Sequence, residues 1–347
     1  MSPVTGAAGS IGSELCRQLV NLRPQRLVLV DNNESGLFEI AEELRVAGQA
    51  DLREALVSIV DADQLLTLFA DERPEIVFHA AAYKHVPMLE VHPAQAVVTN
   101  VVGTRNTLRA AEAAGVRNFV LISTDKAVAR HSVMGCTKRL CELLVLGNPG
   151  EMTCSAVRFG NVVGSRGSVV PLFERQIESG GPVTITHPEM TRYMMTIREA
   201  VSLVISTLVL AKPGHLYMLD MGEPMIIERL AQSLIRARGL RPGTDIQIVY
   251  TGLRPGERLT EDLMGPDEGS RPTSHPAIME VISPSPLLKE DLDWTIERLR
   301  SLAGEGRTEE LVRALRMSVG TRVATDEPQA RRPKRTLDPE RAPAEPE

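Results

Sequence analysis

Residues 123–126 read Ser-Thr-Asp-Lys and place two hydroxyl groups, a carboxylate and an amine side by side. An adjacent acid and amine can divide the acid and base steps of a reaction when burial and mutual charge bring their pKa values toward the working pH. The alternative is an ion pair without a catalytic role. We favour an acid–base site built from Asp125 and Lys126, because both leave the end of a predicted strand.

Lys138 follows Met134 by four positions on a predicted helix, so both side chains project from the same face. A lysine there could hold the ribose of a nicotinamide cofactor. Met134 occupies the position from which a tyrosine would deprotonate an alcohol, and a thioether has no proton to exchange near neutral pH. Met134 is therefore expected to pack against its helix face.

A glycine-rich turn opens the chain, where residues 4–12 read Val-Thr-Gly-Ala-Ala-Gly-Ser-Ile-Gly. Glycine permits a tight turn and lets backbone N–H groups approach a pyrophosphate at the start of the following helix. An ordinary glycine-rich turn is the alternative. The apolar strand at 26–30 ends at Asp31, about 20 residues past Gly12, where an acid can accept hydrogen bonds from an adenosine ribose. Asp31 favours NAD, and NADP stays open.

Strand and helix patterns alternate after this turn with short connections. Helices are expected near 33–47, 62–70 and 93–114, and strands near 54–59, 75–79 and 118–122. This alternation predicts an α/β fold with a doubly wound, Rossmann-type parallel sheet whose ligands lie at the C-terminal strand ends. We expect the dinucleotide to lie across the residues at these ends, which are Gly6, Asp31, Asp61, Ala80 and Ser123.

The alternation loosens after residue 160, which indicates a second, smaller lobe. We assign 1–160 to the dinucleotide-binding domain, with 191–211 returning to it. We assign 161–190 and 212–320 to a substrate-binding lobe. Residues 321–347 are rich in proline and charge and contain no aromatic residue, which predicts a disordered tail.

Composition excludes several classes of protein. The formal net charge of −6 leaves no basic footprint for a nucleic acid. The longest apolar run, 201–211, is about half the ~20 residues that cross a bilayer, so no membrane insertion is expected. The absence of a signal-like start and the unpaired spacing of the four cysteines indicate a cytoplasmic location with reduced thiols.

The motifs together resemble the extended short-chain dehydrogenase/reductase superfamily. Within it they resemble the UDP-N-acetylglucosamine 4,6-dehydratases of the capsule and polysaccharide-biosynthesis family, in the branch whose triad reads Ser-Met-Lys. The resemblance covers 4 to about 264. It rests on the glycine turn and on the segments His-Ala-Ala-Ala-Tyr-Lys-His-Val-Pro at 79–87, Thr-Asn at 99–100, Ser-Thr-Asp-Lys-Ala at 123–127, Met-x-x-x-Lys at 134–138, Arg-Phe-Gly-Asn at 158–161, Thr-Arg-Tyr at 191–193 and Leu-Arg-Pro-Gly-Glu at 253–257.

The resemblance implies a reaction without net oxidation. The cofactor takes hydride from C4 of the sugar, water leaves across C5 and C6, and hydride returns to C6. Lys126 would remove the C5 proton, and Asp125 would protonate the departing C6 hydroxyl. In the absence of a tyrosine, the proton of the C4 hydroxyl would pass to Thr124 and on to Asp125, or to solvent, with Lys138 lowering the local potential.

The same resemblance assigns roles to individual residues. The expected catalytic set is Thr124, Asp125, Lys126, Met134 and Lys138. The expected cofactor contacts are Gly6, Gly9, Ser10, Ile11, Gly12, Asp31, Asp61, Ala80, Ala81, Lys84, Asn100, Ser123 and Lys138. The UDP-amino sugar substrate is expected to contact Lys84, Asn161, Arg192, Arg254 and Glu257. No metal is expected, because His79 and His85 have no companion ligand at metal spacing.

Several alternatives stay open. A UDP-sugar 4-epimerase shares the first oxidation, and a non-catalytic NAD(P) sensor would explain the missing tyrosine. The segment 127–133 also lacks the Asn-Pro pair usual in the family, so this wall of the site could differ. Many relatives carry a membrane-spanning region upstream, and the short first strand, with Pro3 inside it, is compatible with a sequence that starts before Met1.

We expect a homodimer or a higher homo-oligomer. The helices near 93–114 and 132–147 could form a four-helix dimer interface, or they could belong to the core of one chain. The candidate contacts are Val97, Val98, Val101, Leu140, Leu143 and Leu144.

Overall fold

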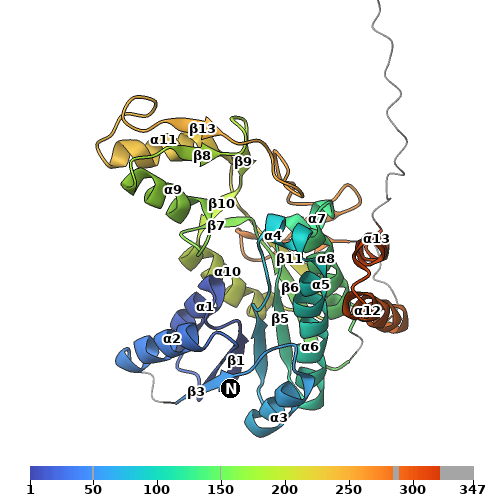
Figure 1. Ribbon diagram of the computed structural model, residues 1–347. Helices are drawn as coiled ribbons and strands as arrows, with labels where there is room; N and C mark the ends of the chain where they lie inside the picture. Colours follow the sequence, from blue (N-terminus) through green and yellow to red (C-terminus); the bar gives the residue numbers. More distant parts are fainter. Residues whose placement is uncertain (49–50, 149, 284–288, 321–347) are drawn as a thin grey trace, which may run out of the picture.

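A nine-stranded sheet in the order β14-β15-β11-β6-β5-β4-β1-β2-β3 forms the centre of the computed structural model (Figure 1), which describes residues 1–48, 51–148, 150–283 and 289–320. In this sheet β11, β6, β5, β4, β1, β2 and β3 run parallel to one another, and β15 and β14 add an antiparallel edge. The strands are β1 (Ser2–Thr5), β2 (Leu27–Asp31), β3 (Leu52–Leu56), β4 (Ile76–His79), β5 (Asn118–Ile122), β6 (Thr153–Arg158), β11 (His215–Leu219), β14 (Gly269–Pro272) and β15 (Ile278–Ile282). The expected α/β fold with a doubly wound sheet is therefore confirmed.

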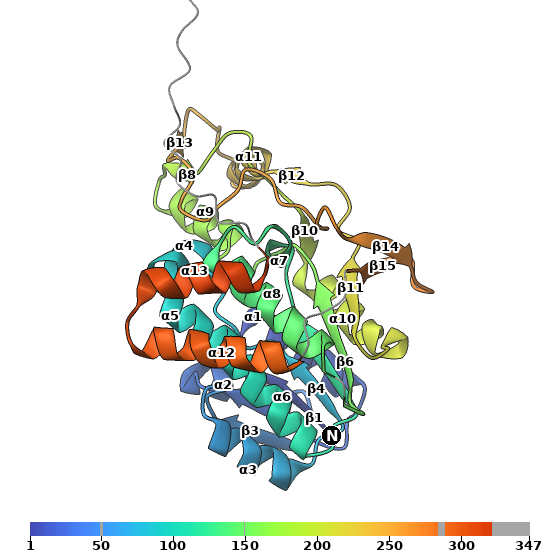
Figure 2. The ribbon, with the colours of Figure 1, turned by 90° about the vertical axis from the view of Figure 1, so that its right-hand side faces the viewer.

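Helices cover both faces of this sheet, as the apolar runs of its central strands require. On one face, α1 (Ser10–Asn21), α2 (Glu34–Val46) and α10 (Ile197–Leu210) share a core with Leu27 and Leu29. On the other face, α3 (Ala62–Glu72), α6 (Gly103–Ala113) and α8 (Val133–Leu146) share a core with Val28 and Val30. Figure 2 shows the second layer in front of the sheet. The alternating side chains of β2 thus serve both layers.

The helix expected near 93–114 is interrupted. It consists of α5 (Pro93–Ala96), a π-helical segment η1 (Val97–Val102) and α6. The π-helical turn widens the ladder at Asn100, a residue that holds the loop after β4. The strand expected near 54–59 also begins earlier, at Leu52, because it pairs in register with β2.

A smaller lobe lies above the C-terminal ends of the parallel strands (Figure 1). Its two helices and the strand pair β8–β13 enclose a core of their own, which includes Phe173, Ile177, Ile227 and Ile235. The strand pairs β7–β10 and β9–β12 complete it. Its elements are β7 (Asn161–Val163), α9 (Val169–Glu178), β8 (Val183–Ile185), β9 (Thr191–Arg192), β10 (Met194–Thr196), β12 (Met225–Ile226), α11 (Ile227–Ala237) and β13 (Ile248–Tyr250).

The expected assignment of 212–320 to the smaller lobe is wrong for much of that range. Strands β11, β15 and β14 belong to the large sheet. The helices α12 (Lys289–Gly304) and α13 (Thr308–Ser318) pack against the helical layer formed by α5, η1 and α8. The chain therefore crosses between the lobes several times, and short strand runs alone did not reveal to which sheet each belongs. The tail predicted for 321–347 lies outside the described residues.

The surface considered for a dimer interface is covered by this chain itself. Leu292, Ile296 and Leu299 of α12, with Leu311 and Leu315 of α13, share one apolar core with four of the six candidate contacts. Of those candidates, Val97, Val101, Leu140 and Leu144 are buried. The intramolecular alternative is therefore the one that the structure shows. Within the described ranges, each helix is too short or too polar to cross a membrane.

We expect Ile296→Ala to lower the free energy of unfolding by about 2–5 kcal/mol, because it opens a cavity under α12. Ile296 is fully buried, whereas Trp294 on the same helix is 64% exposed. Trp294→Ala is the matched control, with an expected cost of about 1 kcal/mol or less. Urea unfolding of both variants measures the difference. Equal costs would show that α12 does not cover this surface.

Candidate active site

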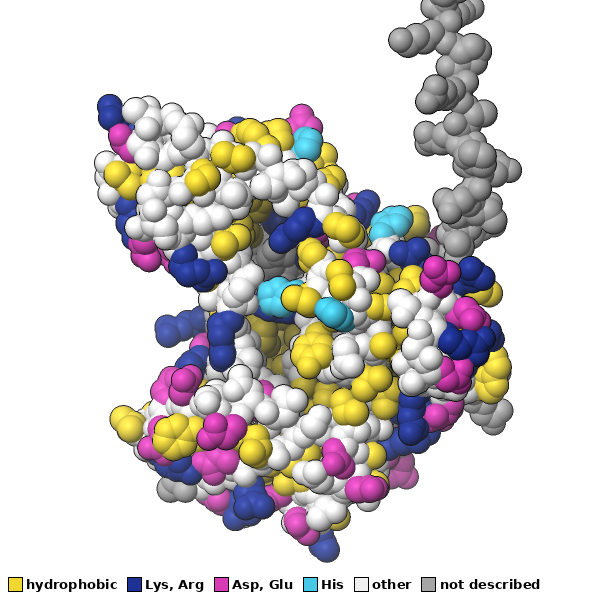
Figure 3. Space-filling view, viewed as in Figure 1, with side chains coloured by type: hydrophobic (Ala, Val, Ile, Leu, Met, Phe, Trp, Pro, Cys, Tyr) yellow, Lys and Arg dark blue, Asp and Glu magenta, His cyan; other side chains and the backbone are white. Residues whose placement is uncertain are grey.

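A cavity of about 470 Å³ separates the two lobes above the ends of β4 and β5. Figure 3 shows the hollow, with Lys and Arg side chains at its rim. Residues of both lobes line it, and all five of the expected substrate contacts are among them. These lining residues include Lys84, Lys126, Asn161, Arg192, Arg254, Glu257 and Glu261.

The glycine turn is packed so closely that side chains are excluded from it. Gly6 has a φ of +73°, and a Cβ there would lie 2.7 Å from the backbone nitrogen of Ala81. A Cβ on Gly12 would lie 1.9 Å from the carbonyl oxygen of Gly6. Helix α1 follows at Ser10, and its N-cap residue Gly9 has no side chain that could cap the helix. The N–H groups of its first turn are thus available to an anion.

The two expected acids beside this turn already accept backbone hydrogen bonds. The Asp31 carboxylate accepts from the N–H groups of Ala8 and Asn33, both at 2.9 Å. Asp61 caps α3 by accepting from the N–H of Gln64 at 3.0 Å. These bonds hold each carboxylate in place at the edge where an adenosine would lie.

The loop after β4 is fixed by Asn100. Its side chain accepts from the N–H of Tyr83 at 2.8 Å and donates to the Tyr83 carbonyl at 3.1 Å and to Thr137 at 3.1 Å. Ala80 and Ala81 begin this loop beneath the glycine turn. Asn100 is buried, and its amide is used within the protein, so its contribution to the site is to position the loop.

His79 is a structural residue at the end of β4. Its Nδ1 lies 2.7 Å from the hydroxyl of Thr5, and its Nε2 lies 2.9 Å from that of Thr104. Burial, together with the charge of Lys138, lowers the pKa of His79 to about 3, so the ring is neutral. In the described part of the chain, no His, Cys, Asp and Glu side chains cluster as a metal site would require.

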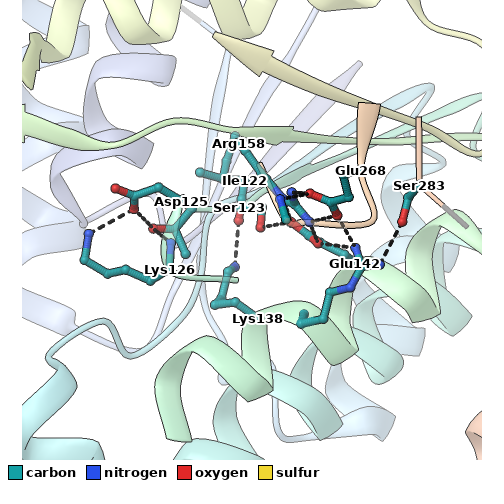
Figure 4. A network of polar contacts seen from close by, with 12 residues as sticks. Ile122, Ser123, Asp125, Lys126, Lys138, Glu142, Arg158, Glu268 and Ser283 are labelled. Carbon is teal, nitrogen blue, oxygen red and sulfur yellow. Dashed lines mark hydrogen bonds and ion pairs between the residues drawn. The ribbon is translucent and has the colours of Figure 1, made fainter. Parts of the chain in front are cut away.

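Thr124, Asp125 and Lys126 form a connected group at the end of β5, where the short helix α7 (Lys126–Ala129) begins. The Thr124 hydroxyl donates to Oδ1 of Asp125 at 2.8 Å. Nζ of Lys126 donates to the same oxygen at 2.9 Å, as Figure 4 shows. Lys126 also donates to Asn161 at 2.9 Å. Oδ2 of Asp125 is buried and has no hydrogen-bond partner among the described residues.

This geometry can supply an acid and a base together. A proton can move from the Lys126 ammonium to the Asp125 carboxylate across one hydrogen bond, with no change in net charge. The result is a neutral amine and a carboxylic acid, which can then take and give a proton at neighbouring atoms of a substrate. The unpaired Oδ2 of Asp125 marks a position where a further polar group would be accommodated.

Lys138 and Met134 are both buried on α8. Nζ of Lys138 donates to the carbonyl of Ile122 at 2.6 Å, and burial lowers the pKa of its amine. Met134 is buried in the core formed by the outer helical layer. The packing role expected of Met134 agrees with this position. Residues 127–133, which lack the Asn-Pro pair of the family, form the rest of α7 and the turn into α8. The N-cap of α8, Ser132, accepts a hydrogen bond from the N–H of Gly135 at 3.0 Å.

A buried ionic network behind the site was missed by the sequence reasoning (Figure 4). The Ser123 hydroxyl donates to Glu142 at 2.6 Å, and Arg158 donates to both oxygens of Glu142 at 2.7 Å. Arg158 also pairs with Glu268 at 2.6 Å, and Arg139 pairs with Glu142 at 2.9 Å. Ser123 thus points away from the cavity. Arg139 and Glu142 are three residues apart on α8, a spacing that does not distinguish an exposed pair from a buried one, so only the motif position of Arg158 gave a signal.

Opposing effects set the protonation of Glu142. Burial alone would raise the pKa of its carboxyl, but the guanidinium groups of Arg158 and Arg139 and the Ser123 hydroxyl hold it at about 2. Glu142 is therefore ionised at neutral pH.

Of the two arginines expected to contact the substrate, Arg192 holds a loop and Arg254 is exposed at the cavity. The Arg192 guanidinium donates to the carbonyls of Arg258, at 2.9 Å, and Leu259, at 3.1 Å, and so holds the loop before Glu261. Arg254 is exposed and pairs with Glu257 at 2.6 Å. Glu261, which sequence reasoning also missed, faces the cavity, and burial raises the pKa of its carboxyl.

We expect Glu142→Gln to cost about 3–5 kcal/mol of stability, because the buried Arg158 loses a partner. Glu142 has a lower pKa folded than unfolded, so its contribution is present above pH 4.5 and is lost as the pH falls toward about 2. The difference between wild type and variant in urea unfolding should narrow over that range. Glu43→Gln, which breaks the exposed pair with Arg17, is the control, at about 1 kcal/mol or less. A pH-independent difference would contradict the assignment.

Comparison with known proteins gives a consistent set of relatives. A family model described as "Polysaccharide biosynthesis protein" matches residues 3–283. The chain is 47% identical over 269 residues to the probable polysaccharide biosynthesis protein EpsC of Bacillus subtilis (strain 168). It is 46% identical over 270 residues to the capsular polysaccharide biosynthesis protein CapD of Staphylococcus aureus. Each match covers 76% of this chain and 45% of the relative. The chain thus spans about half the length of these relatives.

An epimerase and solved structures extend the comparison. A UDP-glucose 4-epimerase of Rickettsia typhi is 33% identical over 281 residues, which are 76% of this chain and 77% of that protein. The structure of Pen from Bacillus thuringiensis is similar with a TM-score of 0.74 and 33% identity, over 83% of this chain and 90% of that one. DesIV, a dTDP-glucose 4,6-dehydratase from Streptomyces venezuelae crystallised with NAD, has a TM-score of 0.66 and 22% identity, over 76% and 88%. The last likeness concerns the fold.

Proposed function

The chain belongs to the polysaccharide biosynthesis protein family, and from this premise we propose that it is an NAD-dependent 4,6-dehydratase acting on UDP-N-acetylglucosamine. The observation that carries the proposal is the pair of Asp125 and Lys126, joined by a hydrogen bond of 2.9 Å at the end of β5. Elimination of water beside a carbonyl needs one acid and one base at adjacent carbons. This pair supplies both from neighbouring residues.

The chain's own residues fit a dinucleotide. The closely packed glycine turn leaves the first N–H groups of α1 open to a diphosphate, and Asp31 is held where a ribose would lie. Proteins of the same fold, including DesIV and a Thermus thermophilus UDP-glucose 4-epimerase, were crystallised with NAD. When bound, NAD would accept hydride from C4 of the sugar and return it to C6.

In this mechanism Asp125 starts as the carboxylate and Lys126 as the neutral amine, and the proton of the C4 hydroxyl first passes through Thr124 to Asp125. The hydrogen bond of 2.8 Å between them provides the path. Lys126 then removes the C5 proton, which the adjacent C4 ketone has made acidic. Asp125 gives its proton to the C6 hydroxyl, which leaves as water, and Lys126 later returns a proton to C5. Each proton taken is given back, so the only loss is one water.

Cations at the cavity would hold the UDP group. Lys84 and Arg254 line the cavity, and a guanidinium can meet a diphosphate with paired hydrogen bonds. Arg192 would act through the loop that it holds, because carbonyl groups already accept from its guanidinium. We also propose a cytoplasmic, homo-oligomeric enzyme, whose subunit contacts lie outside the surface that α12 and α13 cover.

Incubation of the purified chain with UDP-N-acetylglucosamine and NAD should yield a product lighter by one water in mass spectrometry. Asp125→Asn should lower the rate by about 100-fold or more, because the acid for the C6 hydroxyl is lost. Arg241→Gln, on an exposed surface pair of the smaller lobe, should leave the rate unchanged. A wild-type product lighter by one water would support dehydration. Full activity in Asp125→Asn would remove Asp125 from the mechanism.

A UDP-sugar 4-epimerase is the second candidate, favoured by the 33% identity to the Rickettsia epimerase. An epimerase returns hydride to C4 and leaves the mass unchanged. A new stereocentre at C4 without a mass change, seen by NMR of the product, would replace our proposal with this one.

Thr124→Val should slow the oxidation of C4, because valine keeps the shape of threonine and removes the hydroxyl that donates to Asp125. We expect a loss of about 100-fold in kcat with a smaller change in KM, since proton transfer contributes at the chemical step. Thr124→Ser keeps the hydroxyl and should retain most of the rate. Single-turnover measurement of cofactor absorbance reports the step directly. Equal rates for Val and Ser would rule out the relay.

A further inference from the structure

We propose that Arg166, in the loop that follows β7, binds the diphosphate of the dinucleotide from the side of the smaller lobe and so ties that lobe to the glycine turn. This inference rests on the dinucleotide of the proposed function. It adds a binding residue from a part of the chain that follows the dinucleotide-binding segment in sequence. The loop comprises residues 164–168, Gly-Ser-Arg-Gly-Ser.

Two hydrogen bonds already join this loop to the turn. The backbone N–H of Arg166 donates to the hydroxyl of Ser10 at 3.0 Å, and the Arg166 guanidinium donates to the carbonyl of Ala8. Ser10 is the first residue of α1, where the positive end of the helix dipole lies. The guanidinium is therefore held beside the N–H groups that a diphosphate would meet.

The loop is shaped to present this side chain. Gly164 and Gly167, on either side of it, have φ angles of +78° and +69°, in the left-handed region that favours glycine. A Cβ on Gly167 would lie 2.7 Å from the His85 ring. A larger residue at position 167 would displace the loop from His85.

The positive charges of Arg166 and Lys84 are not paired with carboxylates in the described residues. Lys84 donates to Ser165 of the same loop at 3.4 Å. Burial lowers the pKa of Lys84, and the charge of Arg166 lowers it further. An anion between these two cations would relieve their repulsion.

Geometry selects the diphosphate over a ribose 2′-phosphate. Ala8 separates two groups of opposite charge, because its N–H donates to Asp31 while its carbonyl accepts from Arg166. Asp31 marks the ribose side, where a 2′-phosphate would meet a negative charge. Arg166 lies on the other side, next to the start of α1.

The test measures binding of NAD⁺, NADP⁺ and ADP-ribose by calorimetry at two salt concentrations. Arg166→Gln should weaken NAD⁺ and ADP-ribose alike by about 10-fold or more, because a charge-assisted hydrogen bond is lost. The salt dependence of binding should also become shallower. Arg166→Lys, which keeps the charge, should recover part of the affinity. Arg238→Gln is the matched control, since it removes an exposed arginine from the same lobe.

Thermal unfolding without ligand verifies that each variant is folded. Unchanged affinity for NAD⁺ and ADP-ribose in Arg166→Gln would overturn the inference, and so would a loss confined to NADP⁺. A loss equal to that in Arg238→Gln would also overturn it, because a general charge effect would then suffice. These outcomes are separate from the proposed function. Weakened NAD⁺ binding in a chain that does not dehydrate the sugar would support Arg166 and contradict the dehydratase.

Discussion

The paired hydrogen bonds between Arg158 and Glu142 are the contact on which the reactive end of the sheet depends. Arg158 ends β6, Glu142 lies on α8, and Ser123 joins them from the end of β5. Removal of two charges from water is costly, and the cost is offset here because Glu268 and Arg139 occupy the remaining positions. The network therefore fixes where β5 ends, and with it the direction in which Asp125 and Lys126 leave the strand.

A second constraint follows from the close approach of the glycine turn to the loop after β4. A Cβ at Gly6 would meet the backbone of Ala81, so the turn cannot move without that loop. Asn100 holds the same loop from the π-helical turn and contacts Thr137 of α8. The cofactor side and the acid–base side of the cavity are thus connected through α8. Because a close-packed interior is hard to compress, a displacement on one side of the cavity is passed on to the other.

The sequence was sufficient for the parallel sheet, because period and glycine spacing are local properties. The sequence also predicted which residues line the substrate side of the cavity, because motifs at the ends of parallel strands meet at one edge of the sheet. The membership of β11, β14 and β15 in the large sheet was not accessible, because short strands carry no information about their partners. Glu142 and Glu268 were missed for a related reason: a buried charge is identified by its partner, and Glu268 lies far away in the sequence.

The burial of Met134 decides where the groups that transfer protons can lie. The helix α8 has Lys138 bonded to the Ile122 carbonyl and Met134 in the apolar core, so the position of Met134 offers the cavity no proton acceptor. Proton transfer must then come from a group that is both close to the cavity and able to change its charge. The end of β5 meets this requirement, because Lys126 faces the cavity while Asp125 is buried behind it. In the proposed mechanism, a chain with methionine at this position therefore keeps an acid and a base as long as the hydrogen bonds around Asp125 are kept.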